Sequence, residues 1–287
     1  MLGGTRDRLQ LFDQRGHLIV SGRIVGQQVI EPIAQLIVRP NEVVPKLDIN
    51  EDAQSLVFDD SNLFSIDKFS GWDRVEGGGR VNAGLQYTAQ VNRAGSLNVL
   101  FGQSYQLFGQ NSFTVADITN TGLQSGLDKP ISDYVSHITY QPNQIYSFTA
   151  RARFDEATFT PERVEFESRA NFDRWTFQLL YGDYAPQPLL GLPSRREGIV
   201  AAASVKLTEN WIVLGSARYD IFSNQIDQSR FGLGYVDDCF MLSVNWLTGY
   251  TYTATANAAP IRNNTVMLQF SLRTLGPDTL APVGASF

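Results

Sequence analysis

The stretch RVNAGLQYTAQV, residues 80–91, decides the fold because its side chains alternate strictly in character. Every second residue from Val81 to Val91 is apolar, and the residues between them are polar or glycine. A strand places successive side chains on opposite faces, so this period of two predicts a β-strand with one apolar and one polar face. The stretch is also longer than the ~5–6 residues that are common in globular strands.

The same alternation recurs along the chain in segments of about ten residues, which are separated by turn residues. Helical periodicity is scarce, so we predict an all-β, antiparallel fold of about 12–13 strands. One of these strands is expected within 16–25. The others are expected near 28–38, 77–91, 95–107, 132–141, 145–154, 163–172, 174–183, 197–207, 210–221, 228–237, 239–249 and 263–274.

The connections between these segments differ in length. Short turns alternate loosely with longer excursions at 39–76, 108–131, 184–196 and 250–262. Most segments are long enough for a tilted membrane strand, which needs ~9–11 residues. Aromatic residues, 11% of the chain, gather near the ends of the segments, as at Trp175. Long loops at one end, short turns at the other and aromatic girdles are typical of a transmembrane β-barrel in an outer membrane.

Two other classes of protein share the alternation. A soluble, secreted β-rich binding protein also has one apolar and one polar face. A passive, porin-like channel of about twelve strands has the same pattern as a larger barrel. The polar mid-strand residues here are often small and neutral, such as Gly84, Ser104 and Ser243, as a water-filled interior requires. This composition favours a membrane barrel over the soluble protein.

The sequence offers no machinery for catalysis. No Gly-x-Ser-x-Gly or phosphate-loop motif is present. The histidines His17 and His137 and the single Cys239 do not have metal-ligand spacing. We therefore expect no enzyme activity, no catalytic residue, no cofactor and no metal, and a structural role for His137. The net charge of −6 and pI near 5.0 argue against a nucleic-acid partner.

Several motifs carry a resemblance to a known family. The motifs are QVIEPIAQLIVRPN (28–41), the loop FDDSNLFSIDKFSGWDRVEGG (58–78), RVNAGLQY (80–87), FGQSYQL (101–107) and the YVDDCF strand start (235–240). Through them, the stretch from residue 28 to residue 107 resembles the lipopolysaccharide (LPS)-assembly outer-membrane protein family, LptD or OstA, and a weaker similarity continues to about residue 276.

The resemblance implies a very large barrel of roughly two dozen strands or more, preceded by a periplasmic domain. It implies location in the cell outer membrane and insertion of LPS into the outer leaflet through a lateral seam. It also implies an LptE-like lipoprotein that plugs the lumen and a periplasmic LPS bridge that docks on a domain absent from this sequence. The N-terminus shows no signal peptide, so we expect a C-terminal portion of a longer protein. Residues 1–27 would be a strand and turn remnant, 28–276 the barrel part and 277–287 a tail.

The resemblance also singles out candidate site residues. The loop motif contributes Phe69, Gly71, Asp73 and Arg74, and Phe64, Phe69 and Trp72 are expected to anchor this loop inside the lumen. The family often has two adjacent cysteines that pair with the periplasmic domain. Here Asp238 stands in place of the first, so Cys239 is the candidate for an interdomain disulfide. The last strand is the candidate gate strand, with Thr265, Val266, Leu268, Phe270 and Leu272.

Overall fold

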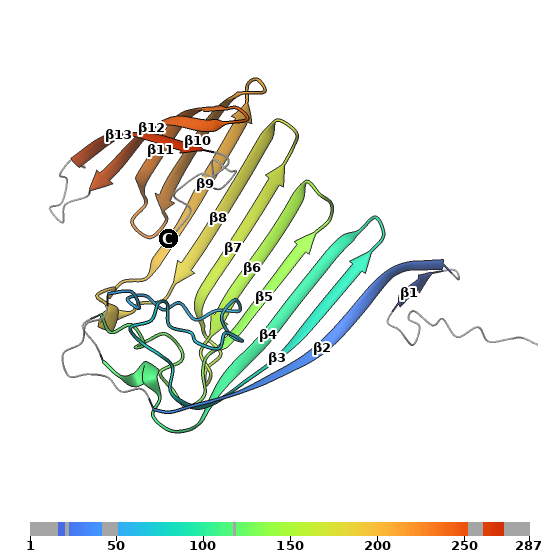
Figure 1. Ribbon diagram of the computed structural model, residues 1–287, viewed down its shortest axis with the longest axis vertical. Helices are drawn as coiled ribbons and strands as arrows, with labels where there is room; N and C mark the ends of the chain where they lie inside the picture. Colours follow the sequence, from blue (N-terminus) through green and yellow to red (C-terminus); the bar gives the residue numbers. More distant parts are fainter. Residues whose placement is uncertain (1–16, 21–22, 42–50, 117–118, 252–260, 273–287) are drawn as a thin grey trace, which may run out of the picture.

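The computed structural model describes residues 17–20, 23–41, 51–116, 119–251 and 261–272. They form one antiparallel sheet of 13 strands, in which every strand pairs with its neighbours in the sequence. The sheet is strongly curved and open, with β1 and β13 at its two edges (Figure 1). The strands are β1 His17–Val20, β2 Arg23–Arg39, β3 Gly78–Val91, β4 Gly95–Phe108, β5 Tyr134–Gln141, β6 Tyr146–Phe154, β7 Pro161–Asn171, β8 Trp175–Tyr184, β9 Arg196–Lys206, β10 Trp211–Asp220, β11 Gln225–Val236, β12 Phe240–Thr251 and β13 Ile261–Leu272.

The predicted all-β, antiparallel fold is confirmed, and β2 and β11 begin clearly earlier than expected. β2 starts at Arg23 because β1 turns back onto it and pairs with its first residues, from Arg23 to Gln27. β11 starts at Gln225, which pairs with Asp220 across a tight turn. Two short 3-10 helices, η1 Ser112–Thr114 and η2 Pro188–Leu190, interrupt the loops. Among the described residues, no helix is both long and apolar enough to cross a membrane.

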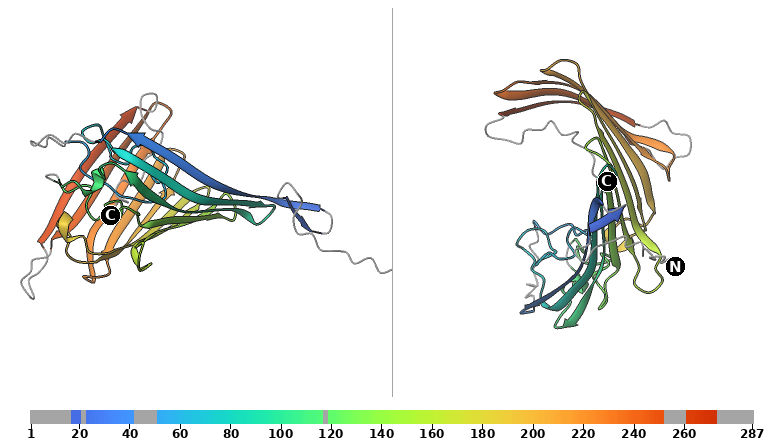
Figure 2. Two further views of the ribbon diagram at one scale, coloured as in Figure 1. Left: turned by 90° about the horizontal axis from the view of Figure 1, so that it is seen from below. Right: turned by 90° about the vertical axis from the view of Figure 1, so that its right-hand side faces the viewer.

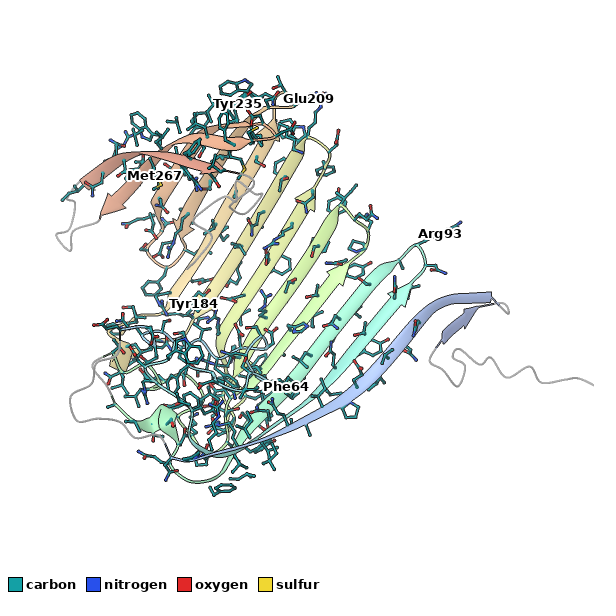
Figure 3. The ribbon with its side chains drawn as sticks, in the orientation of Figure 1. Phe64, Arg93, Tyr184, Glu209, Tyr235 and Met267 are labelled. Atoms are coloured by element: carbon teal, nitrogen blue, oxygen red, sulfur yellow. The ribbon has the colours of Figure 1, made fainter. Side chains whose placement is uncertain are left out.

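The two ends of the sheet differ, as the loop lengths predicted. One end carries short turns, which include Arg93 and Glu209 (Figure 3). The other end carries the long connections from β2 to β3, from β4 to β5 and from β8 to β9. We call these the short-turn end and the long-loop end. In outer-membrane barrels the short turns face the periplasm and the long loops face the exterior.

The two faces of the sheet have the reverse of the polarity that a soluble protein shows. The convex face carries large apolar side chains that are exposed, such as Leu85 at 51% and Leu268 at 68%. The concave face carries polar side chains that are buried, such as Arg80 at 1% and Asn82 at 0%. Two loops lie in the concavity and cover part of this face (Figure 2). Apolar surface of this extent requires an apolar environment, which lipid tails supply.

Aromatic side chains form a belt along the convex side of the short-turn end. Trp175 stacks on Phe177 with ring centroids 6.0 Å apart. Tyr235 contacts Trp211 at 5.2 Å and Phe240 at 5.7 Å, so the belt continues across β10, β11 and β12. Such rings prefer the headgroup level of a membrane, and their position confirms the expected clustering of aromatics near strand ends.

Candidate functional site

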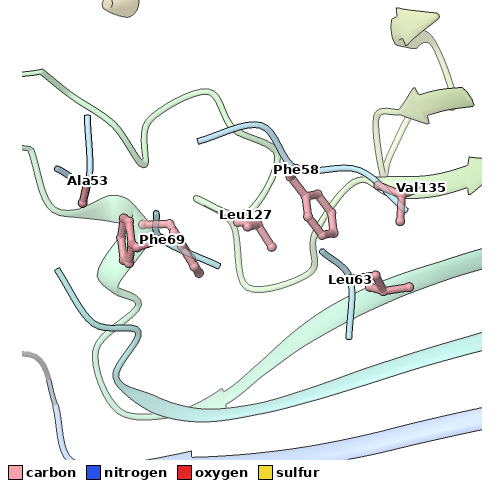
Figure 4. Packing of buried hydrophobic residues seen from close by; sticks show 7 residues of the cluster. Ala53, Phe58, Leu63, Phe69, Leu127 and Val135 are labelled. Carbon is pink, nitrogen blue, oxygen red and sulfur yellow. The ribbon is translucent and has the colours of Figure 1, made fainter. Parts of the chain in front are cut away.

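Two segments fold inward from the long-loop end and close part of the concave face. We call residues 51–77, 109–116 and 119–133 together the plug; they lie against β3 to β6 (Figure 1). Their contact with the sheet has its own apolar core (Figure 4), and Leu56 and Phe64 pack against its edge. The core consists of Ala53, Phe58, Leu63, Phe69, Phe113, Leu127 and Val135. The plug is therefore a packed element with a buried core and not a solvated loop.

A glycine in the strand makes room for this packing. A Cβ atom at Gly102 would lie 2.4 Å from the Cδ2 atom of Leu63 and 2.7 Å from the carbonyl oxygen of Ala83. No side chain fits at that position while Leu63 is seated. The glycine thus leaves room on the concave face of β4 for Leu63 of the plug.

A buried cluster of charges fixes the plug to β3. The Glu76 carboxylate lies 2.6 Å from Nε of Arg80 and 3.6 Å from Nζ of Lys68. Arg80 also donates to Ser104 at 3.3 Å and to Asn111 at 3.2 Å. Burial lowers the pKa of Lys68, and the charge of Glu76 acts in the opposite direction. We call Lys68, Glu76 and Arg80 the plug cluster.

The loop motif shapes the tip of the plug through a reciprocal clamp. The Asp52 carboxylate accepts hydrogen bonds from the backbone N–H groups of Trp72 at 2.8 Å and Asp73 at 3.1 Å. The Asp73 carboxylate in turn accepts from the N–H groups of Glu51 at 2.7 Å and Asp52 at 3.3 Å. Gly71 has φ +80°, and a Cβ atom there would lie 2.2 Å from Cγ of Asp52. The N–H donors hold the pKa of Asp52 below its ordinary value.

The other motif residues bind the plug together. Arg74 donates to the carbonyl oxygen of Ser112 at 2.7 Å, and its guanidinium lies 4.4 Å from the ring centroid of Phe69. Phe69 is buried, and Phe64 is partly buried beside the core, as expected of anchors. The expectation for Trp72 was wrong, because its side chain is 90% exposed. The clamp binds only the backbone N–H of Trp72, and the indole ring is exposed to solvent.

A second charged cluster lies where the plug meets β5 and β6. Asp133, Asp155 and Glu156 bring three carboxylates close enough together to hold a metal ion. The ammonium of Lys129 already contacts all three, at 3.6 Å from Asp133, 2.7 Å from Asp155 and in close contact with Glu156. Burial raises the pKa of Asp133 to about 6, and Lys129 holds the pKa of Asp155 well below its ordinary value. The lysine therefore supplies the positive charge that this acidic group needs.

His137 has the structural role that the sequence predicted. Its Nδ1 atom lies 2.7 Å from the Asp60 carboxylate, and its Nε2 atom lies 2.6 Å from Oδ1 of Asn98. Asp60 belongs to the plug, whereas Asn98 and His137 belong to neighbouring strands. The imidazole thus links the plug to the sheet.

The candidate residues from the sequence fall into three separate places. The motif Phe69 to Arg74 lies in the plug, and Cys239 is exposed in the turn between β11 and β12 at the short-turn end. Thr265, Val266, Leu268, Phe270 and Leu272 lie on β13, at the edge of the sheet. On this strand Val266 is 63% exposed and Phe270 is 60% exposed.

Sequence reasoning missed the residues that line the lumen beside the plug. A cavity of about 570 Å³ lies on the concave face of β6 to β9, next to residues 54–57 of the plug. Its wall contains five arginines and three glutamates. The alternation of β7 places Arg163, Glu165, Glu167 and Arg169 on one face, and this was the available signal. Their pairing partners on other strands could not be read from the sequence.

Comparison with known proteins agrees with this architecture. The sequence profile of a family described as LptD, LPS transport system D, matches residues 21–190. The matched range covers more than half of the chain and includes the plug and the strands from β2 to β8. A search of curated proteins found no match.

Proposed function

The chain belongs to the LptD family, LPS transport system D, and from this premise we propose that it forms part of an outer-membrane barrel wall that delivers LPS to the outer leaflet. The observation that carries this proposal is the inverted polarity of the sheet. Its convex face is exposed and apolar, and its concave face is polar. Such a wall separates lipid tails from water, as an amphiphile with an acyl part and a sugar part requires.

The physical work of this wall is passage, and passage needs no nucleophile. Backbone N–H and C=O groups in hydrocarbon must be paired, and the continuous ladder from β1 to β13 pairs them everywhere but at the two edges of the described sheet. The LPS headgroup would move along the wet concave side while the acyl chains reach the membrane. We expect no catalytic step and no cofactor.

The seam is proposed to involve β13. Its pairing with β12 runs from Phe240–Leu272 to Thr251–Ile261, so one edge of the strand is fully occupied. The opposite edge lies at the margin of the sheet. A lateral exit forms there if the partner strand makes few ladder bonds with β13. Each ladder bond that opens costs on the order of 1 kcal/mol, so a seam with few bonds opens more easily.

Crosslinking tests this seam. Cysteines placed at Thr265, Leu268 or Phe270 would be joined to the first barrel strand in the full-length protein, and LPS delivery to the cell surface would be measured. We expect the lock to stop delivery. The matched control joins Val244 to Leu268, which already face each other across β12 and β13. If locking the seam leaves delivery intact, the gate is elsewhere.

The plug limits where other partners can bind. Because it covers the concave face of β3 to β6, an LptE-like lipoprotein would contact the lumen beyond it, toward β9 to β13. Photoreactive residues placed at Ser216 and Gln269, which share that concave face by register, should capture such a lipoprotein. Capture from the plug alone would contradict this placement.

Cys239 is proposed to form a disulfide with a periplasmic domain. The thiol is exposed at the short-turn end, which faces the periplasm in outer-membrane barrels. In the full-length protein, non-reducing and reducing peptide maps should differ at the Cys239 peptide. A free thiol in the mature, functional protein would refute the disulfide.

A porin-like channel is the function to be distinguished. The chain in detergent should show heat-modifiable migration in a gel, as either barrel would. Cells that lack the protein should lose surface LPS if it belongs to the assembly pathway. Normal surface LPS, together with a steady ion conductance of the purified protein in planar bilayers, would favour the passive channel instead.

A further inference from the structure

The cavity beside the plug differs from the plug in how its charges are satisfied. Arg151 pairs with Asp60 at 3.5 Å, and Arg153 pairs with Asp133 at 3.2 Å. Two further arginines of the wall pair with glutamates of their own strand. The fifth, Arg196, has no carboxylate partner among the described residues. Its charge is therefore available to the cavity.

The surroundings hold Arg196 in place without neutralising it. Its Nη2 donates to Oε1 of Gln187 at 3.2 Å, and its guanidinium lies 5.3 Å from the ring centroid of Tyr184. Its Nε atom is buried and donates to no atom in the described part of the chain. A buried, charged donor without an acceptor is costly to a fold unless a ligand completes it.

A second arginine shares this arrangement. The Arg163 guanidinium lies 5.1 Å from the same Tyr184 ring. Glu165 accepts from Nη2 of Arg163 at 2.5 Å and from the Tyr184 hydroxyl at 2.6 Å, which fixes both side chains. Arg163, Tyr184 and Arg196 thus form a preorganised group on the cavity wall.

We propose that this cavity is a binding subsite for an anionic sugar, in which Arg196 and then Arg163 bind a phosphate or carboxylate group. Arginine is suited to such groups because its planar donors match two oxygens at once. Glu167 and Gln178, which also line the cavity, offer acceptors and donors to sugar hydroxyls. The volume of about 570 Å³ is in the range of pockets that hold small ligands.

This inference rests on the proposed function, since the sugar would be the polar headgroup in transit. The position of the cavity supports it. The wall lies on the concave face, between the plug and the loop that carries η2. A headgroup that passes the plug on this side would meet Arg196 at the long-loop end, where β9 begins.

The test measures binding of a deacylated glucosamine disaccharide that carries two phosphates. The full chain in detergent micelles would be titrated with it by calorimetry. Arg196→Gln should weaken binding at least about tenfold, because one charge-assisted contact is lost. The matched control is Arg195→Gln. Arg195 is the adjacent residue, but it pairs with Asp183 at 2.7 Å and lies outside the cavity.

Three results would overturn the subsite. Equal affinity of Arg196→Gln and Arg195→Gln would place binding elsewhere. Equal binding of the disaccharide without phosphates would remove the role of the anion. Equal binding of inorganic phosphate would remove the role of the sugar. Heat-modifiable migration of each variant shows that it is folded.

The subsite and the transport function fail in different ways. If the protein restores surface LPS to depleted cells but Arg196→Gln binds the sugar phosphate as well as wild type, the subsite is wrong and the function stands. If wild type binds the sugar phosphate through Arg196 but depletion leaves surface LPS unchanged, the function is wrong and the subsite stands.

Discussion

The plug cluster and the Arg196 cavity are built from the same residue types on the same concave face, and they differ in completeness. In the plug cluster, Glu76 lies between Lys68 and Arg80, and all three are almost fully buried. In the cavity, Arg196 has a neutral partner and a ring beside it but no carboxylate in the described residues. A closed cluster stabilises a fold, whereas an incomplete one is suited to a ligand.

The largest expected effect comes from opening the closed cluster. Glu76→Gln leaves two buried cations without their carboxylate, which should cost about 3–5 kcal/mol of unfolding free energy. Urea unfolding in detergent micelles measures this cost, and limited proteolysis should show early cleavage within residues 51–77. The control is Glu209→Gln in an exposed turn at the short-turn end. An unchanged unfolding midpoint for Glu76→Gln would mean that the core alone holds the plug.

The next effect tests the clamp that shapes the plug tip. Gly71 and Gly191 both have positive φ, at +80° and +75°. An alanine at either position pays roughly 1–2 kcal/mol for that conformation. At Gly71 the new Cβ also meets the Asp52 carboxylate, whereas at Gly191 it meets nothing within 4 Å. Gly71→Ala should therefore destabilise more than Gly191→Ala in the same unfolding assay. Equal losses of unfolding free energy would show that the clamp accommodates the new Cβ atom without loss of stability.

The junction of the plug with β5 predicts a dependence on pH. Burial raises the pKa of Asp133 to about 6, above its ordinary value near 3.8, so the folded state favours the protonated carboxyl. The stability that this group contributes is fully present below about pH 4 and is lost as pH rises through about 6. The slope cannot exceed about 1.4 kcal/mol per pH unit for one group. The unfolding free energies of wild type and Asp133→Asn, measured against pH, should diverge between about pH 4 and pH 6. Parallel pH curves would contradict the raised pKa of Asp133.

Much of the fold could be predicted from the sequence, because a period of two fixes which side chains share a face of each strand. Once Val81 to Val91 are assigned to one face, the partner strands and the loop ends follow from turn residues. The apolar residues do not identify the face that meets lipid, because a soluble sheet has the same alternation. The exposure of Leu85 together with the burial of Asn82 resolves this point.

The candidate site was less predictable, because its contacts join residues far apart in the chain. The loop motif Phe69 to Arg74 was found by resemblance, but the partner of its Asp73 is the backbone at Glu51 and Asp52. The motif could not show that Trp72 is left outside the core. The sequence did not single out Arg196, because two adjacent arginines suggest a solvated surface pair. The structure separates them: Arg195 pairs with Asp183, and Arg196 lines the cavity.

The smallest expected effect completes the comparison. Arg196→Gln removes a cation that has no ionic partner in the described residues, so the unfolding free energy should change by less than about 1 kcal/mol. The change is expected to be neutral or stabilising, because burying an uncompensated charge opposes folding. A glutamine can still bond to Gln187, whose Oε1 now accepts from Arg196. Urea unfolding of Arg196→Gln beside Glu76→Gln measures the difference directly. If the unfolding free energy falls as much as for Glu76→Gln, Arg196 serves to stabilise the fold. If the fold is unchanged and sugar-phosphate binding is weaker, Arg196 serves the ligand at some expense of stability, as residues of binding sites commonly do.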